Sequence, residues 1–355
     1  MRMSPTAAIA ASLLVLAAAP SPAQSPLQQA RDEARLAYRR AAAEAREFYQ
    51  GRGRGPEQSD TLSRKIKVGR DGRVSISNVS GSITVTAAAG DEMSIDAVKR
   101  GRGDRRDFDR VHIGIDERPG RVEIRTEYDR TFFRSDNVRV DYTVVVPAGV
   151  SLDINSVSGR LSVDGVKGTV RFGSVSGNIS STNTPRVEYL RTVSGEVDLG
   201  GISQDGSVSI SSVSGNIELA GIKARTLDLN TVSGETRLRD AAVERLTLKA
   251  VSGGLEYAGT LMKNGRYDVN SHSGNVRFTL AGNIGFELNA GSFSGSVRSD
   301  YPMTVGGDRN PDIRLGRGRG RGRGPGNESL QAAFGDGSAS LNLHTFSGNI
   351  AIAKK

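Results

Sequence analysis

The chain has 355 residues, of which 36% are hydrophobic, which is enough for one large domain or two ordinary ones. It contains 44 glycines, no tryptophan and no cysteine, so disulfides, thiolate nucleophiles and cysteine metal sites are excluded. The formal charge of +9 favours anionic partners such as polysaccharides or lipid headgroups.

Residues 1–23 have the pattern of a secretory signal peptide. Arg2 precedes an apolar run from Ala7 to Ala19, and the small residues Ser21, Pro22 and Ala23 suit cleavage. No later segment approaches the roughly 18 apolar residues that a membrane span needs. We therefore expect an exported protein, periplasmic, at the cell surface or extracellular, without a transmembrane segment after signal cleavage.

The next segments differ sharply in composition. Residues 24–50 are rich in alanine and carry a weak apolar seam, which predicts one N-terminal helix. Residues 51–59 contain the sequence GRGRGP and are expected to form a flexible linker. Residues 60–355 are expected to form one repeat domain, with a Gly-Arg loop inserted at 316–327.

The dipeptide Ser-Gly occurs ten times in the chain. The eight copies from Ser158 to Ser294 are separated by 18, 18, 20, 19, 19, 21 and 21 residues. Such a steady period is typical of stacked-repeat architectures. The spacing therefore indicates that the dipeptides belong to a repeated structural unit.

Apolar residues recur at fixed distances around each dipeptide. In one coil Leu152 and Ile154 precede Ser158, and Leu161 and Val163 follow it. This alternation predicts two short strands joined by a Ser-Gly corner, and we expect Val157 to point inward with Leu161 and Val163. The pattern is broken or weakened in some coils, at Glu188, Ala290, Ser181, Thr236 and Ser299.

A period of about 19 β-prone residues predicts an all-β fold, a right-handed parallel β-helix (solenoid) with a short N-terminal helix. Propeller blades need longer repeats, and leucine-rich repeats have another leucine spacing. Coils without the dipeptide are expected to continue the stack at both ends. The interval from Ser80 to Ser158 would hold about four periods, and that from Ser294 to Ser347 two, once the loop is removed.

Three segments, taken with the run of V-S-G coils, resemble a known family. They are NVSGSITV (78–85), DYTVVVPAGVSLDINSVSGRLSV (141–163) and GDGSASLNLHTFSGNIAI (335–352). The combination is similar to the bacterial putative-adhesin β-strand-repeat family of unknown function, over roughly residues 60–352. The resemblance implies an exported or envelope-associated protein, and it supplies no catalytic residues.

The Ser-Gly column is the most conspicuous candidate site. A nucleophilic serine needs a base and an orienting carboxylate, and ten copies would need ten bases. We interpret the dipeptides as structural corners, and the alternative is a hydroxyl column that binds sugar or ions. The residues concerned are Ser158, Gly159, Ser176, Gly177, Ser194, Gly195, Ser214, Gly215, Ser233, Gly234, Ser252, Gly253, Ser273, Gly274, Ser294 and Gly295. The position before the valine is also hydroxylic in Ser156, Ser174, Thr192, Ser212, Thr231 and Ser271.

The three histidines, His112, His272 and His344, show no metal-binding spacing. His272 replaces the valine before Ser-Gly and is expected to face the edge of the core near Phe293 and Val251, with local pH sensing as the alternative. We expect no metal site, no bound cofactor and no catalytic residues.

Outward acidic residues keep an enzymatic alternative open. A polysaccharide lyase or hydrolase on a β-helix would need clustered carboxylates and a basic residue. Here Asp228 and Asp268 are expected in one column with Thr247 between them. The candidate acids are Asp153, Glu196, Asp198, Glu218, Asp228, Glu235 and Asp268.

Gly-Arg segments occur at 51–55, 100–106 and 316–324. Their composition resembles that of nucleic-acid binders, but they lack interleaved aromatic residues, and a signal peptide argues against such a partner. Contact of Arg317, Arg319, Arg321 and Arg323 with a polyanion is the functional interpretation, and a solvated loop is the alternative. The tripeptide Arg102-Gly103-Asp104 matches an integrin ligand, but so short a match arises readily by chance in a stretch rich in these residues.

The sequence thus predicts a non-enzymatic, exported, adhesin-like scaffold. Its partners would be cell-envelope glycans, anionic lipids or other anionic surfaces, or envelope proteins. The alternatives are the β-helical lyase or hydrolase and nucleic-acid binding through the Gly-Arg loops. Open strand edges on terminal coils would also permit end-to-end self-association.

Overall fold

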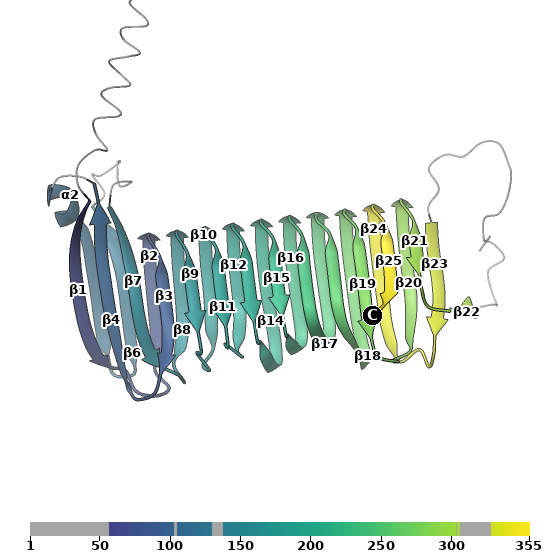
Figure 1. The fold of residues 1–355 in the computed structure, drawn as a ribbon, viewed down its shortest axis with the longest axis horizontal. Coiled ribbons are helices and arrows are strands. Elements are labelled where there is room, and N and C mark those ends of the chain that lie inside the picture. Colours follow the sequence, from purple (N-terminus) through teal and green to yellow (C-terminus); the bar gives the residue numbers. More distant parts are fainter. Residues whose placement is uncertain (1–56, 103–104, 130–137, 303, 306–327) are drawn as a thin grey trace, which may run out of the picture. The chain divides into compact units, whose positions relative to one another are not determined.

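The computed structural model describes residues 57–102, 105–129, 138–302, 304–305 and 328–355. Most of these residues are in β-strands, and the one helix among them is the short α2, Arg105–Asp109. The strands stand side by side in a long row (Figure 1). The predicted signal peptide, the helix at 24–50 and the Gly-Arg loop at 316–327 lie outside the described residues.

The strands form one nearly closed, solenoid-like sheet with two faces. The entry face holds the strands that run into a Ser-Gly corner, and the exit face holds those that leave it. Each face is extended at its ends by strands that pair with these. The entry face, in spatial order, comprises β5 (Val111–Arg118), β6 (Arg121–Tyr128), β2 (Arg73–Ser80), β8 (Ser151–Ser158), β10 (Val170–Ser176), β12 (Val187–Ser194), β14 (Ser203–Ser214), β16 (Lys223–Ser233), the second halves of β17 (Thr236–Ser252) and β18 (Leu255–Ser273), β24 (Ala339–Ser347), β20 (Phe286–Ser294), β23 (Glu328–Phe334) and β22 (Thr304–Val305). The exit face comprises β1 (Gln58–Lys67), β4 (Glu92–Gly101), β7 (Val138–Pro147), β3 (Ile83–Ala88), β9 (Leu161–Asp164), β11 (Ile179–Thr182), β13 (Val197–Gly200), β15 (Ile217–Ala220), the first halves of β17 and β18, β19 (Val276–Ala281), β25 (Ile350–Lys354) and β21 (Val297–Ser299).

Successive coils are in register at their corners. Ser158 lies beside Ser176, and Ser176 beside Ser194, in parallel ladders. The N–H of Gly159 donates to the carbonyl of Ser176 at 3.1 Å, so the corner backbone is bonded to the next coil. Backbone groups buried between coils are therefore paired by the stacking itself.

The predicted alternation forms the core. Leu152, Ile154, Leu161 and Val163 are each at most 2% exposed, which confirms their inward position. Ala290, which weakens the apolar pattern, also lies inward and is fully buried. Side chains on one strand face therefore meet those of the opposite face and exclude water.

The break in the pattern at Glu188 is accommodated by an irregularity in β12. Val170 of β10 pairs with Val187, but the next residue, Arg171, pairs with Tyr189. Because of this shift, the side chain of Glu188 is exposed to solvent and that of Val187 is buried in the core. A β-bulge of this kind restores the apolar register at the cost of one unpaired position.

The N-terminal end departs from the expected four continuous coils. β2 pairs directly with β8, so the coils of Ser80 and Ser158 are neighbours. The intervening residues extend the sheet outward through antiparallel pairs, β4 with β7 and β1 with β4 on one face, and β5 with β6 on the other. The first strand begins at Gln58, inside the segment predicted as a linker.

The C-terminal end also differs from a simple continuation. The last coil, β24 and β25, is inserted between two coils that precede it in the sequence. β24 pairs with β18 on one side and β20 on the other, and β25 pairs likewise with β19 and β21. The strand β23 then closes the entry face by antiparallel pairing with β20. The expectation of two further coils between Ser294 and Ser347 is wrong for this reason.

Candidate binding face

The outward side chains of the entry face follow from strand alternation. Because Leu152 and Ile154 point inward, the next inward position is Ser156, and Val157 must point out. Ser156 is 5% exposed, whereas Val157 is 47% exposed. The expectation that Val157 points inward with Leu161 and Val163 is therefore wrong, because it broke the two-residue period within one strand.

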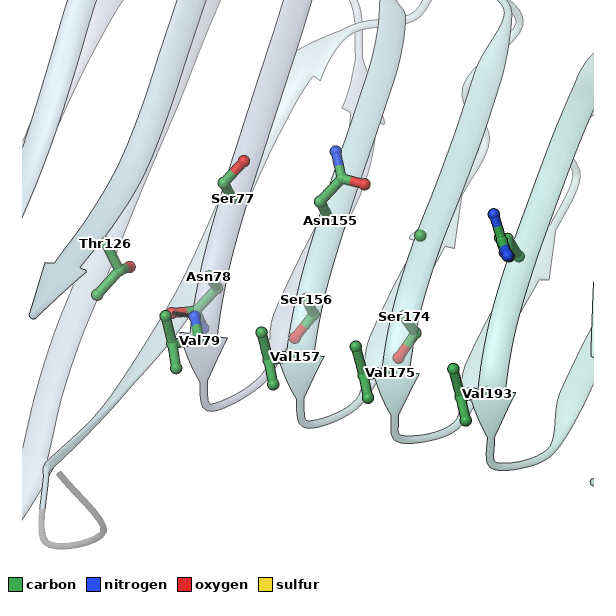
Figure 2. Close-up of a pocket in the computed structure, with 12 residues that line it drawn as sticks. Ser77, Asn78, Val79, Thr126, Asn155, Ser156, Val157, Ser174, Val175 and Val193 are labelled. Atoms are coloured by element: carbon green, nitrogen blue, oxygen red, sulfur yellow. Dashed lines mark hydrogen bonds between the residues drawn. The ribbon is translucent and has the colours of Figure 1, made fainter. Parts of the chain in front are cut away.

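The same inversion holds along the stack and creates an exposed apolar column, which we call the valine ladder. In Figure 2, Val79, Val157, Val175 and Val193 stand in one row on neighbouring strands, at the place where each strand enters its corner. The members of the ladder, in spatial order, are Val79, Val157, Val175, Val193, Val213, Val232, Val251, His272, Phe346 and Phe293. Val79 is half-buried and His272 is exposed. The remaining members are between 41% and 52% exposed.

Aromatic rings occupy the C-terminal end of the ladder. His272 stacks on Phe346 with ring centroids 5.0 Å apart, and Phe346 stacks on Phe293 at 4.7 Å. The expectation that His272 faces the core edge is wrong, since it belongs to the exposed ladder. His272 and Phe293 are separated by one coil, because the last coil, which carries Phe346, is inserted between their two coils.

A second outward column runs beside the valine ladder, two residues earlier on each strand. It contains Ser77, Asn155, Gly173, Arg191, Ser211, Asn230, Lys249, Asn270, His344 and Gly291. Figure 2 shows Ser77 and Asn155 of this column above Val79 and Val157. Arg191 and Lys249 have no side-chain hydrogen bond or ion pair within the described part of the chain.

Three hollows follow the groove between these columns. The first, of about 530 Å³, is lined by the valines from Val79 to Val193 and by Arg191. The second, of about 310 Å³, is lined by Val213, Val232 and Val251 with Arg191 and Lys249. The third, of about 630 Å³, lies at the aromatic end and includes His272 and His344. Among the described residues, no aspartate or glutamate lines any of the three.

The hydroxyl column lies beneath the ladder rather than on the surface. Thr192 and Thr231 donate to the carbonyls of Ser194 and Ser233 at 3.2 and 3.1 Å. The hydroxyls of Ser156, Ser174 and Ser212 are buried and have no hydrogen-bond partner among the described residues. These hydroxyl oxygens are covered by the protein, although Ser156 and Ser174 are among the residues that line the first hollow and Ser212 is among those that line the second.

Most Ser-Gly corners share a backbone geometry with a positive φ at the glycine, and Gly253 and Gly295 are the exceptions. The φ angles of Gly159, Gly177, Gly195 and Gly215 are +131°, +145°, +121° and +137°, a region that only glycine adopts readily. A Cβ atom on Gly195 would lie 2.2 Å from the carbonyl oxygen of Gly177 in the adjacent coil. Among the described residues, no corner serine hydroxyl is hydrogen-bonded to a histidine or a carboxylate, and Ser194 donates to the carbonyl of Val175 at 3.3 Å.

Asp198 and Glu218 lie side by side on the adjacent strands β13 and β15, and several of the candidate acids are paired. The carboxylate of Asp153 accepts from Asn155 at 2.8 Å, and Glu218 pairs with Arg239 at 2.6 Å. Asp228 and Asp268 share a column with Thr247 between them, as predicted. No group of three potential metal ligands occurs in the residues that the structure describes.

At its N-terminal end the first hollow is bounded by Thr126 of β6. The hydroxyls of Thr126 and the buried Tyr142 are hydrogen-bonded at 2.7 Å. Burial raises the pKa of Tyr142 to about 12, partly offset by this hydrogen bond. Burial, together with the neighbouring Tyr142, raises the pKa of Tyr128 to about 12.

These tyrosines predict a loss of stability at alkaline pH. Their folded pKa lies above the unfolded value of about 10, so the stability they contribute is complete below pH ~10 and is lost as the pH rises towards ~12. Tyr142→Phe is expected to cost about 1–3 kcal/mol at pH 8, because Thr126 loses its buried partner, and to flatten the decline above pH ~10. Urea unfolding at several pH values measures both effects, and a decline as steep as that of the wild type would refute the assignment to Tyr142.

The Gly-Arg contacts predicted at Arg317, Arg319, Arg321 and Arg323 lie outside the described residues. No helix among the described residues has the length and hydrophobicity needed to cross a membrane.

Comparison with known proteins adds the following. No curated protein matches this chain. A crystal structure of a putative cell adhesion protein from Clostridium sporogenes ATCC 15579 is 10% identical, with 84% of this chain and 100% of that chain covered, at a TM-score of 0.23. A crystal structure of a putative adhesin from Bacteroides fragilis NCTC 9343 is 11% identical, with 82% and 97% covered, at a TM-score of 0.38. Identities and scores this low carry no information about function.

A family model described as Toastrack DUF4097 matches residues 72–321, which is more than half of the chain. The matched region begins just before β2 and includes most of both faces of the sheet. The chain therefore belongs to the Toastrack DUF4097 family.

Proposed function

We propose that this protein is a non-enzymatic, exported, adhesin-like scaffold that binds cell-envelope glycans, anionic surfaces or envelope proteins. The observation that carries the proposal is the valine ladder with its neighbouring column, a repeated outward surface from Val79 to Phe293. Exposed apolar surfaces of this extent typically mark contact sites. Glu218, beside Asp198, is held in an ion pair with Arg239, and no group of three potential metal ligands occurs among the described residues, which favours binding over catalysis.

The finer architecture belongs to this proposal. A right-handed parallel β-helix with coils of about 19 residues is supported by the Ser-Gly spacing and by the handedness of parallel crossovers. Export is supported by the signal-peptide pattern of residues 1–23, and it would place the protein in the periplasm, at the cell surface or outside the cell. Self-association through terminal strand edges would be a further use of the same fold.

The test is retention of the mature full-length chain on envelope material. Purified protein would be mixed separately with isolated envelope glycan, anionic vesicles and solubilised envelope proteins at moderate salt. We expect retention on at least one of these materials. Retention on none of them would refute the scaffold role. If deletion of residues 316–324 alone abolishes this retention, the binding is instead assigned to the Gly-Arg loop.

Nucleic-acid binding is checked with the same deletion. If it leaves salt-dependent retention on DNA unchanged, the Gly-Arg loop is not a nucleic-acid site.

A further inference from the structure

Among the described residues, the first hollow combines an apolar wall with one cationic side chain that has no partner. Its wall is the part of the ladder formed by Val79, Val157, Val175 and Val193. Arg191 is the only charged residue that lines it, and this guanidinium has no partner within the described part of the chain. A ligand that fits this pattern is apolar along its length and anionic at one end.

The dimensions of the hollow suit a single acyl chain. From Val79 to Val193 there are three steps between coils, about 14 Å at ~4.8 Å per step. One acyl chain fills half of a hydrocarbon core that is roughly 30 Å thick, or about 15 Å. The volume of about 530 Å³ also falls within the usual range for small-molecule sites.

A peptide strand fits less well. The backbone groups of β8, β10 and β12 are already paired with neighbouring coils, so the groove offers no free strand edge. An extended peptide would lay its polar backbone along valine side chains without hydrogen-bond partners, which is costly. An acyl chain requires only apolar contact.

A second copy of the chain fits less well for electrostatic reasons. Two ladders packed antiparallel about their midpoint would bring Arg191 of one copy opposite Lys249 of the other, because these residues lie in the fourth and seventh of ten rows. In the part of the chain that the structure describes, no acidic residue lines the first or second hollow to compensate for this repulsion.

We propose that the first hollow binds one linear anionic amphiphile, with its acyl chain along Val79, Val157 and Val175 and its carboxylate or similar headgroup at Arg191. The proposal rests on the proposed scaffold function, since it names one ligand class for that surface. The two can fail separately, because a chain that is retained on envelope material but does not bind the amphiphile refutes only this assignment of the hollow.

The probe is laurate, measured by calorimetric titration of the full-length chain below the concentration at which laurate forms micelles. We expect one laurate per chain. Val175→Asp is expected to weaken binding more than tenfold, because it places an anionic side chain in the middle of the apolar wall. The matched control is Val251→Asp, which makes the same change in the same ladder outside the first hollow, and it should leave the affinity within twofold. Circular dichroism of both variants establishes that they are folded.

The role of Arg191 is tested by head-group preference. Wild-type protein should prefer laurate to dodecyltrimethylammonium, which has the same chain with a cationic head. Arg191→Gln should lower the affinity for laurate about fivefold, and Arg191→Glu should reverse the preference.

Several outcomes would overturn the proposal. One is the absence of laurate binding by the wild type. Another is an equal loss of laurate affinity in Val175→Asp and Val251→Asp, which would show that laurate binding depends on the whole ladder and not on the first hollow. A third is an unchanged head-group preference in Arg191→Glu. Binding to anionic vesicles that both valine variants lose equally, without laurate binding, would assign the ladder to membrane surfaces instead.

Discussion

Replacing Gly195 by alanine is expected to lower the free energy of unfolding by about 4 kcal/mol or more. The φ angle of Gly195 is +121°, which is strained for any residue with a Cβ atom. The added Cβ would also lie 2.2 Å from the carbonyl oxygen of Gly177, a backbone atom held by the stacked coils. Relief therefore requires the coils to separate locally. Urea unfolding followed by circular dichroism measures the loss.

Gly90 provides a matched control for this substitution. Its φ is also +121°, but a Cβ atom at Gly90 would meet no atom within 4 Å. Gly90→Ala therefore carries the backbone strain alone, about 1–3 kcal/mol. The difference between the two variants isolates the contact between coils. Equal losses would show that the Ser-Gly corners do not depend on close stacking.

Removing residues 338–355 is expected to unfold more of the chain than the coil that is deleted. β24 and β25 lie between the coils of Ser273 and Ser294, so their loss uncovers β18 and β19 and detaches β20 and β21. The buried Leu341, Leu343, Ile350 and Ile352 alone represent about 6–12 kcal/mol of apolar burial. Limited proteolysis with mass spectrometry should show cleavage throughout 286–302 in the truncated chain.

The control for this truncation removes only Lys354 and Lys355, at the end of β25. It should leave the protection of 286–302 unchanged. If the chain truncated after Gly337 also kept that segment protected, the inserted position of the last coil would be wrong, and a simple sequential stack would be favoured.

The alternating core was predictable because apolar residues at positions such as Leu152 and Ile154 are spaced by the period of a strand. The inward or outward direction of Val157 was equally readable from that period, since it is an odd number of residues from both. The error came from treating every valine near a corner as core. Composition alone does not suggest that the hydroxyl of Ser156 is buried while Val157 is exposed. The two-residue period of the strand does predict it.

The order of the coils could not be predicted from the sequence in the same way. Nothing in the local sequence distinguishes a coil that follows its predecessor from one inserted one place earlier, as β24 is between β18 and β20. The aromatic core was hidden for a similar reason. Tyr257 stacks on Phe278 with centroids 4.9 Å apart, and Tyr267 meets both rings edge-on, although aromatic residues are only 5% of the chain. Long-range packing brings together residues that no periodic pattern groups.

The central claim is that binding takes place on the outward ladder and not at the Ser-Gly corners. It is tested most directly by retention on envelope material of two full-length variants. One carries Ser158→Ala, Ser176→Ala and Ser194→Ala, and the other carries Val157→Thr, Val175→Thr and Val193→Thr at the adjacent positions. The serine variant should bind as the wild type does, and the valine variant should bind at least about tenfold more weakly, with both equally folded. Loss of binding in the serine variant, with binding kept in the valine variant, would contradict the account.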